Sequence, residues 1–278
     1  MKYIYDEFES IEQMLRTLRN RTPNKVWAGK KLDSENEGRG FSGTSSYEEA
    51  ERLIRDGYIK PLEKIKRGVE VNAKGNVTRK STIINDVIGF APCVPNAILG
   101  LPKSMIDMKT NTKKEKIISI LYDATDSGGV CEGTFVKAGI AVLTIINSLE
   151  VQGYRVSLRV TFYNANTSSD KERTFASVNL KDWRQPLDLK KMTFPFCHPS
   201  MLRRIGFKWI ETQPDLTESG YYGGYGRPLH RVKSNEEIIK GLKDNKLLRE
   251  NEKYINIGIC EGEDFDAQKI AKACGLNI

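Results

Sequence analysis

Histidine is scarce in this chain, which contains only His198 and His230. Histidine is the commonest general base and metal ligand in enzymes. A histidine-built hydrolase would need both residues or would depend on carboxylates, and no H-E-x-x-H motif is present. The sequence therefore argues against histidine-based catalysis.

Paired cysteines and long apolar runs are also missing. The five cysteines are widely spaced without a C-x-x-C pair, which indicates a reducing compartment and no structural zinc. No run approaches the roughly 20 apolar residues of a membrane-spanning helix. The N-terminus turns acidic at Asp6 and Glu7 before an apolar signal core develops. We therefore expect a cytoplasmic protein without a membrane partner.

What the chain does have is enough apolar sequence for one large core and a smaller appendage. It has 278 residues, of which 39% are hydrophobic and 29% charged. Its net charge of +8 is spread along the sequence without a dense block. That charge permits contact with nucleic acid or with an acidic protein.

Residues 1–108 are predicted to form an N-terminal α+β region. Apolar residues from Phe8 to Leu18 recur at helical spacing, and the helix should end before Pro23. A capping box at 46–49 begins a second helix, which Gly57 ends. Two apolar segments, 69–71 and 77–84, flank a Lys-Gly-Asn turn, which predicts a β-hairpin.

Residues 109–278 are predicted to form an α/β domain with three layers and a mostly parallel, Rossmann-like sheet. A buried strand at 117–122, a helix at 134–149 and a strand at 154–162 make a β-α-β unit. An edge strand is expected at 173–180 and a buried strand at 254–259. Further helices are expected at 199–205, 236–248 and 266–274.

Two loops at the carboxyl ends of these strands are candidates for a binding site. Asp123-x-Thr125-x-Ser127 follows the first strand, and the acidic stretch 260–264 follows the last. Ligands of open α/β sheets bind at such strand ends. One carboxylate and two hydroxyls suit Mg²⁺, although the same residues are also ordinary turn and helix-capping residues.

The ordered set of motifs resembles a von Willebrand factor A-like domain over residues 113–278. The Asp-x-Thr-x-Ser loop, the Gly153-Tyr154-Arg155-Val156 strand start and the loop from Gly223 to Leu229 match that family in order. Glu261 stands where the family has an aspartate. Arg227 stands where the family has a metal-binding threonine, so the resemblance is to a degenerate metal-ion-dependent adhesion site.

Arg227 decides how this site is interpreted. A guanidinium beside Mg²⁺ would be repelled strongly. Either Arg227 points away, or no metal binds, or the arginine supplies the positive charge by pairing with Asp123 or Glu261. We favour the metal-free site with no cofactor. If a divalent ion does bind, the resemblance implies Mg²⁺ held by Asp123, Thr125, Ser127 and Glu261.

The resemblance implies a binding protein, because members of this family present the strand-end site to an acidic side chain of a partner. We expect a non-enzymatic interaction or scaffold protein, with Tyr221, Tyr222 and Tyr225 also on its contact face. The family context implies an AAA+ ATPase as one partner. Residues 45–50, 86–90 and 94–95 resemble uncharacterised bacteriophage proteins, which implies the host cytoplasm and a viral assembly component as another partner.

Two alternatives come from other classes of protein. A nucleic-acid-binding protein would use the Tyr/Gly loop at 221–227 together with a basic stripe. The residues of that stripe are Lys190, Lys191, Arg203, Arg204 and Lys208. A Mg²⁺-dependent hydrolase would use Asp123, Glu261 and Asp264, but no nucleophile or base accompanies them. Cys197 and His198 are adjacent in sequence, so they should point apart.

Overall fold

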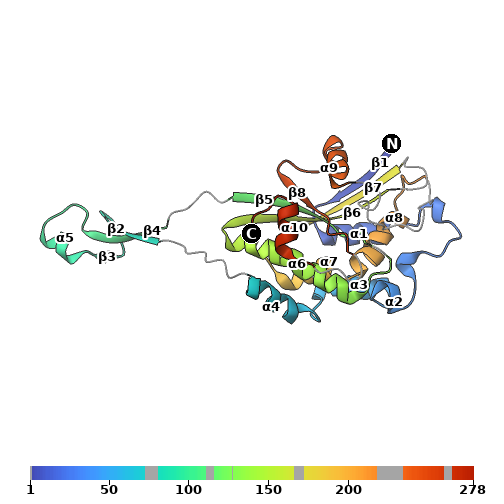
Figure 1. Cartoon of the computed structure of the whole chain (residues 1–278), viewed down its shortest axis with the longest axis horizontal. Coiled ribbons are helices and arrows are strands. Elements are labelled where there is room, and N and C mark those ends of the chain that lie inside the picture. The colour runs from blue at the N-terminus through green and yellow to red at the C-terminus, as the bar shows by residue number, and fades with distance from the viewer. Residues whose placement is uncertain are drawn as a thin grey trace.

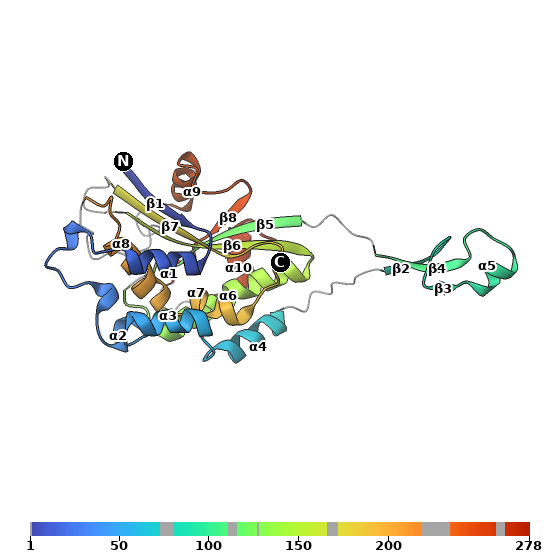
Figure 2. The same ribbon diagram turned by 180° about the vertical axis from the view of Figure 1, so that it is seen from behind.

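The computed structural model of the chain has a layered body and an arm that projects from it (Figure 1, Figure 2). The structure describes residues 2–72, 81–110, 116–126, 128–165, 172–217, 234–259 and 265–278. The arm is residues 81–110, and the body comprises the other described residues. The arm lies apart from the body in both views.

A five-stranded sheet forms the centre of the body, in the order β1-β7-β6-β5-β8. The strands are β1 (Lys2–Phe8), β5 (Lys116–Asp123), β6 (Tyr154–Ala165), β7 (Glu172–Lys181) and β8 (Glu252–Ile255). All neighbouring pairs are parallel except β6 and β7. The mostly parallel α/β sheet confirms the predicted fold class.

Helices cover both faces of the sheet. Those of the body are α1 (Ile11–Asn20), α2 (Arg39–Ser42), α3 (Tyr47–Asp56), α4 (Leu62–Asn72), α6 (Glu132–Val151), α7 (Leu189–Cys197), α8 (Phe207–Glu211), α9 (Asn235–Asp244) and α10 (Ala267–Ala273). Successive strand residues point to opposite faces. Ile120 and Tyr122 of β5 enter the large core with α1, α6 and α7, whereas Leu121 packs in a second cluster with Ile238 and Leu242 of α9. The body therefore has three layers (Figure 1).

Helix α6 connects β5 to β6 and confirms the predicted β-α-β unit, in which Asp123 pairs with Thr161 across the parallel strands. By length and composition α6 could cross a membrane, but most of its apolar stretch is buried inside the protein. Gly139 lets α7 approach α6 closely, because a Cβ there would lie 2.6 Å from the carbonyl oxygen of Phe196.

Strand β1 was not predicted, and its position corrects the prediction for residues 173–180. β1 pairs with β7 along its whole length, so β7 lies inside the sheet and is not an edge strand. Only Ile4 and Phe8 of β1 are buried, and Tyr5 is exposed, which explains the weak sequence signal. Residues predicted to belong to an N-terminal region thus contribute to the same sheet and core as residues 116–276.

Helix α3 begins and ends where predicted. The hydroxyl of Ser46 accepts a hydrogen bond from the backbone N–H of Glu49 at 3.2 Å, and Gly57 ends the helix with a φ of 88°. In a capping box the Glu49 carboxylate would accept the backbone N–H of Ser46. Here it accepts the backbone N–H of Ser45 at 2.7 Å, one residue earlier. The C-terminal strand β8 and helix α9 are shorter than predicted, and α10 follows its cap Asp266.

The hairpin predicted around residues 74–76 is wrong in its first strand, because residues 69–71 lie in helix α4. The second segment contributes β2 (Ser81–Asp86), which pairs instead with β4 (Met105–Thr110). Together with β3 (Ala91–Pro92) and the short helix α5 (Val94–Ile98), these strands make up the arm. The predicted helix at 199–205 is a wide π-helical turn, Met201–Gly206, between α7 and α8.

Candidate functional site

The predicted aspartate stands at the carboxyl end of β5, beside the end of β8. Asp123 is only 2% exposed. Its Oδ1 accepts hydrogen bonds from the backbone N–H of Thr125 at 3.0 Å and from the Thr125 hydroxyl at 2.7 Å. Its Oδ2 accepts from the hydroxyl of Tyr254 at 2.5 Å and from the side-chain amide of Asn256 at 3.2 Å. Each carboxylate oxygen therefore already has two protein donors.

The orientation of the Asn256 amide follows from a second bond. Its Oδ1 accepts the backbone N–H of Gly258 at 2.8 Å, which turns the amide nitrogen toward Asp123 and Tyr254. An asparagine that bonds two residues ahead is a common turn device. Asn256 thus ties the loop after β8 to the end of β5.

Burial dominates the electrostatics of this cluster. It raises the pKa of Asp123 to about 6, although the bonds from Tyr254 and Thr125 favour the charged form and act in the opposite direction. Burial and the neighbouring carboxylate raise the pKa of Tyr254 above its ordinary value, so its hydroxyl remains a donor. Asp123 can therefore take up a proton near neutral pH.

Of the residues predicted for the adhesion-type site, the structure describes Asp123 and Thr125. Thr125 lies against Asp123, but its hydroxyl faces the carboxylate as a donor. Ser127, Arg227, Glu261, Asp264 and the three tyrosines lie outside the described residues. Among the residues that are described, no group of three His, Cys, Asp or Glu side chains could hold a metal ion. The donors around Asp123 occupy the lone pairs that Mg²⁺ would need.

A groove of about 460 Å³ begins at Tyr254 and Asn256 and runs between α9, β8 and α10. Its exposed cations are Lys243, Lys253 and Lys269, and its apolar lining includes Ile239, Ile257 and Ile270. Glu252 also lines the groove but is buried and already paired. The groove therefore combines a positive rim with an apolar floor.

The partner of Glu252 is Arg159, which is buried at the centre of β6. The guanidinium binds both oxygens of Glu252, at 2.9 and 2.5 Å, and also Glu7 of β1 at 2.8 Å. This network links three strands of the sheet beneath α9. The arginine in a central strand, covered on both faces, is the sequence signal that could have revealed a buried ion pair.

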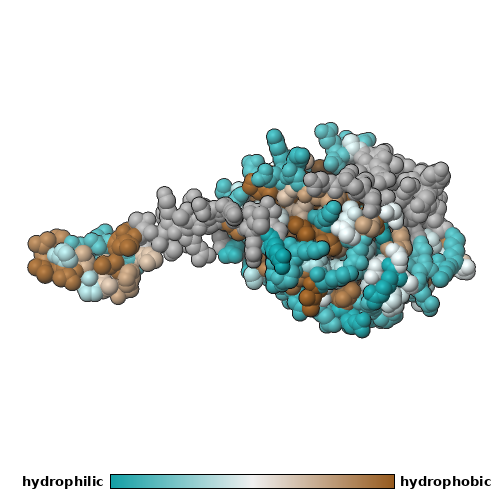
Figure 3. Space-filling view, turned by 60° about the horizontal axis from the view of Figure 1, so that its bottom comes forward, coloured by the Kyte–Doolittle hydropathy of each residue, from teal (hydrophilic) through white to brown (hydrophobic). Residues whose placement is uncertain are grey.

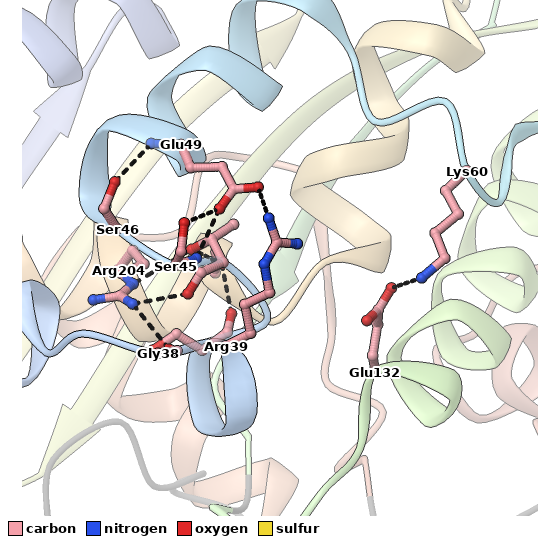
Figure 4. Close-up of polar contacts among 11 residues, drawn as sticks. Gly38, Arg39, Ser45, Ser46, Glu49, Lys60, Glu132 and Arg204 are labelled. Atoms are coloured by element: carbon pink, nitrogen blue, oxygen red, sulfur yellow. Dashed lines mark hydrogen bonds and ion pairs between the residues drawn. The ribbon is translucent and has the colours of Figure 1, made fainter.

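The basic stripe predicted for nucleic acid is not exposed at its centre, because Arg203 and Arg204 are buried. Figure 4 shows Arg204 beside Gly38 in the loop that precedes α3. The Arg204 guanidinium also donates to the carbonyl oxygens of Ser34 and Thr44, both at 2.9 Å. Arg203 donates to the carbonyl oxygens of Phe41 at 2.6 Å and Val130 at 3.1 Å. These arginines hold the chain together instead of presenting charge.

The three lysines of the predicted basic stripe differ in their exposure to solvent. Lys208 forms an ion pair with Glu35 and is mostly covered, whereas Lys190 and Lys191 at the start of α7 are exposed. Phosphate binding would therefore depend on these two lysines and on residues 221–227, which lie outside the described part of the chain.

Cys197 and His198 do not form a nucleophile and base. Burial raises the pKa of the Cys197 thiol and lowers the pKa of His198 to about 4. The His198 ring stacks on Phe194, and its Nδ1 accepts the backbone N–H of Ser200 at 3.1 Å. Both residues serve the packing of α7 against the body.

The family model of a domain of unknown function, DUF7192, matches the chain over residues 2–276. The chain belongs to the DUF7192 family. The DUF7192 match spans the body, the arm and the predicted boundary at residue 108. No curated protein and no solved structure matches the chain.

Proposed function

We propose that this DUF7192 protein is a non-enzymatic protein-interaction or scaffold protein that resembles a von Willebrand factor A-like domain and needs no bound metal. In this proposal the strand-end face receives an acidic segment of a protein partner. The single observation that carries it is the saturation of Asp123 by Thr125, Tyr254 and Asn256, directly beside a groove rimmed by lysines.

The charges explain why a metal would not be needed. In an adhesion-type site the ion lets a partner carboxylate bind next to the protein's own carboxylate. Here the charge of Asp123 is shielded by four donors, and Lys243, Lys253 and Lys269 offer positive charge to an incoming carboxylate. The apolar floor of the groove would accept the apolar side chains of the same segment.

The non-enzymatic part of the proposal is supported by the burial of Cys197 and His198 and by the saturated Asp123. An AAA+ ATPase or a viral assembly component as partner, and a bacteriophage origin, rest on the sequence resemblance alone. In either case the partner segment should be acidic.

A binding titration tests this proposal. The probe is a short fluorescein-labelled peptide of alternating glutamate and leucine, and the variants are Lys253→Glu and Lys269→Glu. Each should weaken binding by about tenfold or more, since it replaces attraction by repulsion. Lys64→Glu makes the same change at an exposed site on α4 and should leave binding unchanged.

The contrary outcomes are specific. Failure of the wild-type chain to bind the peptide, or equal weakening by all three variants, would reject the groove as an acidic-peptide site. Steeply salt-dependent binding of a DNA oligonucleotide that displaces the peptide would favour the nucleic-acid alternative instead.

A further inference from the structure

The arm, residues 81–110, exposes most of its apolar side chains. Nine of the thirteen large hydrophobic residues that are exposed in the described chain belong to it. Six of them gather beyond β2, namely Val87, Ile88, Phe90, Val94, Ile98 and Leu99. Figure 3 shows apolar side chains gathered on the arm, whereas the visible face of the body is largely hydrophilic.

The arm has no core of its own among its described side chains. None of residues 83–108 is buried, and Ile88 and Ile98 are 82% and 79% exposed. Its shape is held by backbone hydrogen bonds, such as those from Phe90 to Ile106 at 3.0 Å and from Cys93 to Ser104 at 2.7 Å. An apolar surface of this kind gains free energy when another surface covers it.

The size of the surface fits a protein interface. Nine large apolar side chains are exposed on this one segment, whereas the largest apolar patch on a typical monomer is only about 300–600 Å². One side of a stable interface takes about 800 Å² and about 20–30 residues. The arm, residues 81–110, has the length of one such side.

The charge of the arm favours a second arm as the partner. Asp86 and Asp107 balance Lys103 and Lys109, so the arm is neutral although the whole chain carries +8. Two arms can meet without the repulsion that would separate two basic bodies. A lipid surface fits less well, because the carboxylates of Asp86 and Asp107 beside the apolar patch are costly in a bilayer. The basic residues next to the arm, Lys74, Arg79, Lys80, Lys113 and Lys114, flank it in the sequence and are not part of the apolar segment.

The backbone of the arm is also prepared for pairing. Strand β2 is at the edge of the three-stranded sheet, and in the described part of the chain no strand pairs with its outer side. Residues 81–86 include no proline or lysine, which commonly protect edge strands. Two β2 strands related by a twofold axis would pair antiparallel and join the two sheets into one.

We propose that two copies of this chain associate through their arms, with the apolar patch covered and β2 paired with β2 of the second copy. This inference goes beyond the proposed function, because it concerns a different surface and holds whether or not the lysine-rimmed groove binds an acidic segment. In both views the arm lies away from the body, so a second arm can reach it (Figure 2).

Sedimentation velocity of the full chain over a range of concentrations tests this inference. The wild type should sediment as a dimer with twice the 31.5 kDa chain mass. Ile88→Asp and Ile98→Asp should each weaken self-association by about a hundredfold, because each places an unpaired charge in the covered patch. Ile59→Asp changes an equally apolar, 61% exposed residue of the body and should leave the dimer intact.

Salt gives an independent check, since apolar association should change by less than about twofold between low and high salt. A wild-type chain that stays monomeric at high concentration would overturn the inference. So would a dimer that both arm variants leave unchanged while their circular dichroism matches the wild type. Binding of the wild type, but not of Ile88→Asp, to phosphatidylcholine and phosphatidylglycerol vesicles as a monomer would assign the arm to membranes instead.

Discussion

The hydroxyl of Tyr254 donates a hydrogen bond of 2.5 Å to Oδ2 of Asp123, across the neighbouring parallel strands β8 and β5. The two residues are 131 positions apart in the sequence. This bond, with those of Thr125 and Asn256, closes the strand end at which the sequence predicts a degenerate metal site.

Removal of the Tyr254 hydroxyl should destabilise the protein. Tyr254→Phe leaves Asp123 buried with one donor fewer, which should lower the free energy of unfolding by about 1–3 kcal/mol at neutral pH. Tyr5→Phe is the matched control, because Tyr5 is exposed, and it should change little. Urea denaturation of both variants measures the difference. Equal stabilities would contradict the account of the Asp123 cluster.

Asp123 should make stability fall as pH rises. Its pKa in the folded state is about 6, above the ordinary value of 3.8, so the folded protein holds a proton that the unfolded chain releases. The resulting stabilisation is complete at low pH and is lost as pH rises through 6, with a span of about 3 kcal/mol. Asp123→Asn loses hydrogen bonds at every pH because its amide nitrogen faces donors, but it has no proton to release. The stability of the variant relative to wild type should therefore rise between pH 4 and pH 7, as measured by urea denaturation. A difference that does not vary with pH would contradict this assignment.

His198 should act in the opposite direction. Burial lowers its pKa from 6.5 to about 4, so the unfolded chain binds a proton that the folded protein does not. Its contribution is present above pH 6.5 and is lost as pH falls through 4, again with a span of about 3 kcal/mol. The variant His198→Gln should therefore lose less stability than wild type between pH 7 and pH 4 in thermal unfolding. A steeper loss in the variant would refute the prediction.

Arg204 should fix the loop before α3 to the body. Arg204→Lys keeps the charge but loses most of the bonds to carbonyl oxygens of residues 34–44, as Figure 4 shows for part of this cluster. We expect a loss of about 2–4 kcal/mol and faster proteolysis in that loop. Arg52→Lys, at an exposed position of α3, is the control and should match wild type. Unchanged proteolysis in Arg204→Lys would mean that other contacts hold the loop.

Gly139 should be required for the contact between α6 and α7. Gly139→Ala places a methyl group 2.6 Å from the Phe196 carbonyl oxygen and against the Cys197 sulfur, which should destabilise the protein by about 1–3 kcal/mol. Gly133→Ala lies on the same helix with no atom closer than 3.8 Å and should be neutral or stabilising. Thermal unfolding of both variants compares them directly. A neutral effect of Gly139→Ala would show that the two helices can separate.

The sequence predicted the layers of the body because local periodicity determines them. The β5-α6-β6 unit and the cap of α3 follow from apolar spacing and from capping residues that are near each other in the chain. β1 escaped prediction because its apolar and aromatic residues, Tyr3, Ile4, Tyr5 and Phe8, do not alternate with polar ones, and its pairing with β7 is a tertiary contact. The helix at 69–71 shows a short apolar run being mistaken for a strand.

The sequence predicted where the candidate site lies, but it did not predict the burial of Asp123 or its hydrogen-bond partners. Asp123 and Thr125 lie at the strand end as the motif predicts, yet their surroundings depend on Tyr254 and Asn256, which only the fold brings near. Arg203 and Arg204 illustrate the same limit, because a sequence shows charge but does not show burial. The exposure of the apolar side chains of the arm is likewise a property of the tertiary structure, which the sequence of residues 81–110 does not reveal.

The central claim is that the strand-end site works without a metal, and thermal unfolding tests it most directly. The purified chain is unfolded with EDTA and then with millimolar Mg²⁺ or Mn²⁺, alongside Arg227→Thr and Asp123→Asn. The account predicts the same unfolding temperature for the wild type in all conditions, because protein donors already occupy both oxygens of Asp123. A rise with Mg²⁺ that disappears in Asp123→Asn would contradict it, since a ligand that binds only the folded state raises stability.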